Sequence, residues 1–219
     1  MGITSLPKLA SLDLSESLTN LMLFYLESLA SLDLSKNFEL RDLDINDLPE
    51  LDSLDLSNNS ELGVLRLNNL PKLHSLNLSN NFEFTWFEIT DSPALDTLVL
   101  SGIIKTLNLV NLESLESLDL SECLGLINLY IWNLPKFNSL TLPDELDFLS
   151  TVHLYKNQLG IVMLIEILEK LPDRIGINYQ ECKIYDNPGL VGLTDPDLSL
   201  YNTAKAQAEA NGWSVEDRL

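Results

Sequence analysis

One leucine pattern recurs along the first two-thirds of the chain and restricts its fold more than any other feature. Segments such as LPELDSLDLS at residues 48–57 and LESLESLDLS at residues 112–121 return about every 22 residues. A second pattern lies between them, as in LRDLDI at residues 40–45 and LINLYI at residues 126–131. We name the first pattern half A and the second half B. Each coil of the chain contains one copy of both halves.

The spacing of the leucines predicts short strands stacked into a solenoid. In LxL the leucines are two positions apart, so both point to the same side of an extended strand. About seven coils, stacked about 4.8 Å apart, then bury a continuous column of leucine that no single coil can bury alone. About a quarter of the 219 residues are leucine, in agreement with such a core.

The expected fold class is α/β by convention and mainly β. Residues 1–159 are predicted to form a solenoid of about seven 22-residue coils with two parallel strand ladders. The period ends after Leu159, and residues 160–219 are expected to form a C-terminal helical and extended cap of the same structural unit. Within the cap, residues 175–189 suggest a short extended piece and a turn.

Two helices are expected in the cap. Residues 160–173 have the apolar stripe of an amphipathic helix, formed by Val162, Met163, Ile165, Leu168 and Leu171. The second helix is expected to begin at Thr194 or Asp195 and to run to about Asn211, with Gly212 after it.

The segment LSTVHLYKNQL at residues 149–159 fits the leucine-rich-repeat pattern LxxLxLxxNxL in full. Together with the LDLSxN segments, it resembles the short repeats of the internalin type on bacterial surfaces. The tail at residues 185–215 is similar to the closing segment of secreted leucine-rich proteins from gut and oral anaerobes. The resemblance implies a leucine-rich-repeat fold and an extracellular or cell-surface location. One departure concerns positions where the family usually has its asparagine ladder, which here carry Leu26, Leu48, Leu70, Leu112 and Leu134.

The two halves differ in the side chains that they turn outward. Half A repeats the pattern Ser-x-Asp-x-Ser, and such sameness suits a structural role because a ligand is not itself periodic. Half B varies from coil to coil, and exposed Trp and Tyr side chains are enriched at binding hot spots. We expect half B to form the concave, ligand-facing sheet, with these candidate binding residues: Trp86, Asn128, Tyr130, Trp132, His153 and Tyr155.

An alternative stays open for these aromatic side chains, namely packing beneath the C-terminal segment as part of the cap. A structure in which residues after 160 bury Trp132 and Tyr155 would exclude binding there.

A metal site and an active site are the next hypotheses. The column of Asp13, Asp33 and Asp55 raises the question of calcium, but the GGxGxD calcium repeat is absent, and a solvated hydrogen-bonded ladder is favoured. His74 suits a surface position, and Cys123 and Cys182 have no catalytic or metal-binding motif around them. We therefore expect no metal, no cofactor and no enzymatic activity.

The formal net charge of −20 disfavours nucleic acid as a partner. No apolar run approaches the length of a membrane span, so we expect no insertion into a membrane. The chain begins within a repeat, so either it is cytoplasmic or an export signal has been removed. Uncovered leucines at the N-terminal coil suggest a longer parent protein or end-to-end association, and they are Leu6, Leu9, Leu12 and Leu14.

Two classes of function remain. The first is a non-enzymatic recognition module that binds a protein or a glycan through half B. The second is a structural spacer or scaffold within a larger surface protein whose function lies elsewhere. Replacing Trp132 and Tyr155 separates the two, because only the first class loses a ligand.

Overall fold

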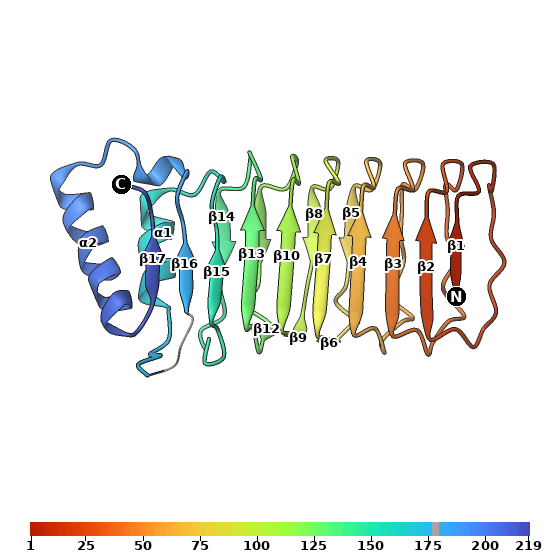
Figure 1. The fold of residues 1–219 in the computed structure, drawn as a ribbon, viewed down its shortest axis with the longest axis horizontal. Coiled ribbons are helices and arrows are strands. Elements are labelled where there is room, and N and C mark those ends of the chain that lie inside the picture. Colours follow the sequence, from red (N-terminus) through yellow and green to blue (C-terminus); the bar gives the residue numbers. More distant parts are fainter. Residues whose placement is uncertain (177–179) are drawn as a thin grey trace.

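Half B of successive coils contributes the strands of one long parallel sheet (Figure 1). The structure, a computed structural model, describes residues 1–176 and 180–219. Its ten-stranded sheet consists, in spatial order, of β1 (Gly2–Thr4), β2 (Asn20–Phe24), β3 (Asp42–Asn46), β4 (Val64–Asn68), β7 (Trp86–Thr90), β10 (Thr106–Val110), β13 (Asn128–Trp132), β15 (Thr151–His153), β16 (Glu181–Lys183) and β17 (Ser214–Glu216). The chain is thus mainly β, a parallel solenoid of about seven coils of about 22 residues.

Equivalent residues of successive coils lie directly opposite one another in this sheet. Asn20 pairs with Asp42, Asp42 with Val64, and Val64 with Trp86. In β2, β3, β4 and β13 the second and fourth residues are buried and apolar, and the residues between them are partly or fully exposed. We name the solvent-facing side of the ten-stranded sheet the outer face.

Half A is paired less regularly than the even repeat predicts. It forms two separate strand pairs, β5 (Ser75–Asn77) with β8 (Thr97–Val99), and β11 (Ser117–Asp119) with β14 (Ser139–Thr141). A third small sheet at the corner between the halves contains β6 (Glu83–Phe84), β9 (Gly102–Ile104) and β12 (Cys123–Leu124). Within residues 31–57, all of which are described, no backbone hydrogen bond joins the half A segments of neighbouring coils.

The core is a leucine column closed on both sides by the two halves. Leu43, Leu56 and Leu65 are fully buried, as are their equivalents in the next coils. Leu48 and Leu70, which come directly before the recurring proline of half A, are also fully buried. At roughly 1.5–3 kcal/mol for each buried side chain, this column is the main stabilising contribution.

Buried asparagines lie at the opposite corner, after half A. The Nδ2 of Asn59 donates to the backbone carbonyls of Leu34 at 3.1 Å and Asn37 at 2.8 Å. Asn81 repeats this arrangement one coil later, with Leu56 and Asn59 as acceptors. These amides satisfy carbonyls at the turns and tie each coil to its neighbour.

The cap continues the sheet instead of merely covering it. Strands β16 and β17 add to β15 in parallel, so the sheet crosses the expected boundary at residue 159 without a break. The 22-residue spacing does end there, because Thr151 pairs with Glu181, 30 residues further along the chain, but the strand ladder of half B continues. The segment CKIYDN at residues 182–187 repeats VHLYKN at residues 152–157. Of the expected extended piece at residues 175–189, residues 177–179 lie outside the described part of the chain.

Two helices complete the cap. Helix α1 (Ile161–Glu169) begins after Gly160, and helix α2 (Asp195–Ala210) has Thr194 as its N-cap and Asn211 as its C-cap, as expected. A single 3₁₀ turn, η1 (Pro188–Leu190), precedes α2. The buried stripe of α1 differs from the expected one, because Val162 is exposed and the residues that face the core are Leu164, Ile167 and Leu168.

The two ends of the solenoid differ (Figure 1). Helix α2 lies at the C-terminal end, beyond β17, whereas at the other end β1 pairs only with β2. As expected, Leu9, Leu12 and Leu14 there are only partly buried, and Leu6 is exposed. A separate search of the described residues finds no helix that is long and apolar enough to cross a membrane.

Candidate binding surface

Three aromatic rings stack in a row across the C-terminal part of the outer face. Trp132 is the last residue of β13, and its ring stacks on that of Tyr155, with 5.5 Å between ring centroids and 17° between planes. Tyr155 in turn stacks on Tyr185, at 4.6 Å and 18°. The guanidinium carbon of Arg218 lies 3.6 Å from the centroid of the Tyr185 ring. We name Trp132, Tyr155, Tyr185 and Arg218 the aromatic row.

The row exists because of a conformation that each strand shares at its end. The residue after each ring of the row has a positive φ, namely Asn133 at 61°, Lys156 at 57° and Asp186 at 56°. This left-handed residue turns the chain away from the sheet at the same level in every coil. The side chains just before it therefore line up.

A second, polar line runs beside the row. The rings of Tyr130 and His153 make an edge-to-face contact, with 5.0 Å between their centroids, and the Nε2 of His153 lies 2.7 Å from Oε1 of Glu181. The Nζ of Lys183 lies 2.9 Å from the other Glu181 oxygen. Glu181 therefore joins the imidazole of β15 to the ammonium group of its own strand.

Burial and charge act in opposite directions on this line. Burial lowers the pKa of His153, although its hydrogen bond to Glu181 works against that shift. The hydrogen bond from Lys183, followed by that from His153, holds the pKa of Glu181 below its usual range despite burial. The carboxylate of Glu181 thus holds the His153 ring in place.

The cap covers one of the candidate rings in part. Tyr185 of the cap stacks on Tyr155, yet Trp132 and Tyr155 both remain partly exposed. Residues after 160 therefore do not bury the two rings fully, while the packing of Tyr155 against the cap agrees with one part of the capping alternative. The cap also extends the surface.

The structure brings together four of the six expected residues. Tyr130, Trp132, His153 and Tyr155 form one cluster of ring contacts. Trp86 lies two strands from β13, where its indole N–H donates to Glu88 at 2.9 Å. Asn128 donates to the Thr106 hydroxyl at 3.2 Å and so contributes to pairing within the sheet.

Sequence reasoning missed the cap's contribution to this surface. Tyr185, Arg218, Glu181 and Lys183 all belong to it, yet they follow the end of the recognised period. For Tyr185 a signal was present, because KIYDN repeats HLYKN. No comparable signal marks Arg218.

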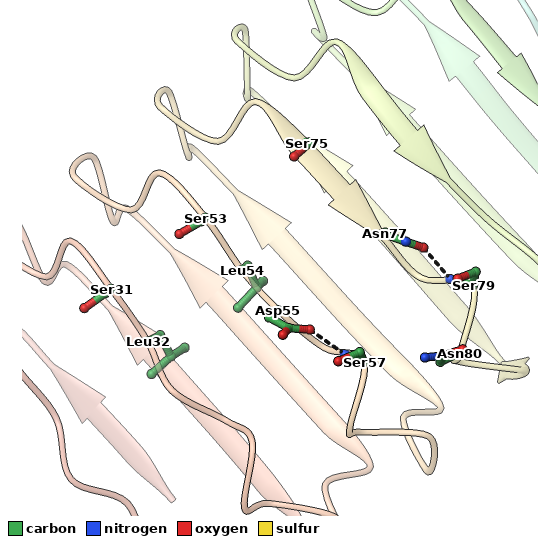
Figure 2. Close-up of a pocket in the computed structure, with 10 residues that line it drawn as sticks. All are labelled: Ser31, Leu32, Ser53, Leu54, Asp55, Ser57, Ser75, Asn77, Ser79 and Asn80. Carbon is green, nitrogen blue, oxygen red and sulfur yellow. Dashed lines mark hydrogen bonds between the residues drawn. The ribbon is translucent and has the colours of Figure 1, made fainter.

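The hollow in Figure 2 lies on half A and has a volume of about 340 Å³. Leu32 and Leu54 lie among repeated serines there. Asp55 accepts a hydrogen bond from the Ser57 N–H at 2.9 Å, and Asn77 accepts one from Ser79 at 3.0 Å. The same groups recur in each coil, so this hollow offers no chemistry of its own.

The repeated aspartates of half A act as turn acceptors. Hydrogen bonds from Ser35 hold the pKa of Asp33 below its usual range, and those from Ser57 do the same for Asp55. In the part of the chain that the structure describes, no group of three His, Cys, Asp or Glu side chains is arranged to hold a metal ion.

Neither cysteine is arranged as a nucleophile. Burial raises the pKa of the Cys123 thiol and of the Cys182 thiol to about 12. Thiols with such pKa values carry almost no thiolate near pH 7. His74, the second histidine, is exposed on half A.

Comparison with models of known protein families gives no match, and comparison with curated protein sequences gives none either. The class that the fold defines is a parallel β-solenoid with a helical cap. Its function has to be argued from the outer face.

Proposed function

We propose that this protein is a non-enzymatic recognition module of the leucine-rich-repeat type, which binds a protein or glycan ligand through the outer face. The observation that supports this most is the aromatic row, whose rings are partly exposed on the outer face. Trp, Tyr and Arg are the side chains most enriched at binding hot spots.

The stacking also prepares the surface for binding. Each ring in the row is held by the next, with centroids 4.6–5.5 Å apart. Side chains that are already ordered lose little conformational entropy when a ligand arrives. Mobile rings at the same positions would lose more conformational entropy on binding, and the ligand would then bind less tightly.

The resemblance of the repeats to internalin-type leucine-rich proteins supports an extracellular or cell-surface location. A solenoid with one constant and one variable face also suits recognition, because the variable face can change without disturbing the fold.

The test is a binding screen with the double variant W132A/Y155A. Wild-type protein and variant are applied to arrays of glycans and of host proteins, and we expect the ligand signal of the wild type to be lost. The matched control is F38A/F148A, which removes two exposed rings away from this surface. Equal signals from wild type and W132A/Y155A would contradict the proposal.

A structural spacer is the second candidate, and one observation favours it. The row joins the repeat strands β13 and β15 to the cap strand β16. If W132A/Y155A unfolds at lower urea concentration while every ligand signal survives, the spacer is the better explanation.

A further inference from the structure

The ring faces of the aromatic row are covered by neighbours within the sheet. Tyr155 lies between Trp132 and Tyr185, and Arg218 lies over Tyr185. Val110, opposite Trp132 in the register, is only 5% exposed. Flat ligands stack on open ring faces. Ring edges with hydroxyl and indole N–H groups suit the mixed polar and apolar surface of a polypeptide.

Charges near the row are balanced in pairs. Glu181 lies 2.9 Å from the Nζ of Lys183, and Glu216 lies 3.1 Å from the Nε of Arg218. The row itself therefore gives little preference for the charge of a ligand. Any such preference has to come from elsewhere on the outer face.

The centre of the outer face is acidic. Asp42 and Asp44 project from β3 and Glu88 from β7, with Arg66 of β4 between them. Across the described residues, none of these three carboxylates has a Lys or Arg nitrogen within 4.0 Å. Three carboxylates thus face one guanidinium, on a molecule whose formal net charge is already −20.

Asp44 is partly buried and makes no ion pair within 4.0 Å across the described residues. Burial raises the pKa of its carboxyl group, Arg66 opposes this shift without cancelling it, and Glu88 adds a smaller increase. A partly desolvated carboxylate without an ion pair is stabilised when a ligand supplies a cation.

The distance between the acidic centre and the aromatic row fits a short peptide. Strands β4, β7 and β10 separate β3 from β13. At about 4.8 Å for each step between strands, the gap is about 19 Å. An extended polypeptide advances about 3.3 Å per residue, so about six residues bridge it.

We propose that the ligand of the outer face is a basic segment of polypeptide. It lies across the strands, with Lys or Arg side chains at Asp42 and Asp44 and an apolar or aromatic side chain against the aromatic row. This inference rests on the proposed recognition function and names the class of its ligand.

The test uses the full chain, immobilised and panned against a phage library of random dodecapeptides. We expect the enriched peptides to carry Lys or Arg about six residues from an aromatic or apolar residue. Their affinity, measured by calorimetry, should fall about tenfold or more for D42N/D44N and should weaken as salt is added. The matched control E116Q/E145Q changes the net charge equally at exposed positions away from the outer face and should bind as the wild type does.

Two results would overturn this inference. One is enrichment of no peptide, or of peptides without basic residues; the other is equal affinity for wild type and D42N/D44N. If W132A/Y155A loses binding while D42N/D44N keeps it, the basic ligand is wrong and the recognition function stands. If an enriched peptide or array ligand binds W132A/Y155A as tightly as wild type, the proposed binding surface itself fails.

Discussion

The ring of Tyr185 lies on the ring of Tyr155, with 4.6 Å between centroids and 18° between planes. Tyr155 follows the last strand of the repeat, and Tyr185 follows the first strand of the cap. The contact therefore fixes the cap to the solenoid through the same surface that we propose for ligand binding. Stability and recognition are coupled at this pair.

Removing this contact should destabilise the protein. We expect Y185A to lower the free energy of unfolding in urea by about 2 kcal/mol, from lost stacking and lost apolar burial. Y185F keeps the ring and should stay within about 0.5 kcal/mol of wild type. In a protein that already carries Y155A, Y185A should lower the free energy of unfolding by less than it does in wild type. An equal decrease in both backgrounds would show that the two rings do not interact.

Gly102 occupies a position that only glycine fits. Its φ is +81°, and a Cβ built there would lie 2.5 Å from the carbonyl oxygen of Phe82 on the neighbouring coil. We expect G102A to lower the free energy of unfolding by about 3 kcal/mol, since both the backbone conformation and the close approach are lost. G160A serves as the control, because no atom lies within 4 Å of its Cβ. Similar melting temperatures for the two variants would contradict this expectation.

The asparagine ladder at the half A corner should be sensitive to substitution. N59A removes hydrogen bonds to the carbonyls of Leu34 and Asn37 and leaves both buried without this donor. A loss of about 2–3 kcal/mol is expected in urea unfolding. Asn58 is the adjacent residue and is exposed, so N58A should change stability by less than about 0.5 kcal/mol. The prediction fails if the two variants unfold alike.

Acid should weaken the cap through Asp217. Burial opposes ionisation of this carboxyl group, but hydrogen bonds from Lys205 at 2.7 Å and Tyr201 at 2.9 Å outweigh it and lower its pKa. A lowered pKa in the folded state gives stability that is present above the unfolded pKa of about 3.9 and is lost as the pH falls through the folded value.

The comparison of wild type with D217N measures this effect. We expect wild type to melt at a higher temperature near about pH 7, and the difference from D217N to shrink as the pH falls below the unfolded pKa of about 3.9 and through the lower folded value, because a protonated Asp217 resembles asparagine. A difference that is independent of pH would show that the charge of Asp217 does not contribute.

Much of the fold was predictable from local patterns. The period of the leucines predicted the register in which Asn20, Asp42 and Val64 lie side by side. The spacing of about 22 residues ends after Leu159 as expected, but strands β16 and β17 continue the sheet beyond that point. The expected apolar stripe of the first helix was wrong at Val162, which is exposed, while Leu164 and Ile167 face the core.

The sequence alone determined the solenoid, because leucines two and three positions apart dictate which side of each strand is buried, and that rule is local. Only the tertiary structure decided that Tyr185 and Arg218 complete the row begun by Trp132 and Tyr155. Their places depend on where the cap strands join the edge of the sheet. The segments that lead to those strands are longer than a coil and do not follow the repeat spacing. Contacts of that kind are set by the packing of the whole cap and not by the spacing of neighbouring residues.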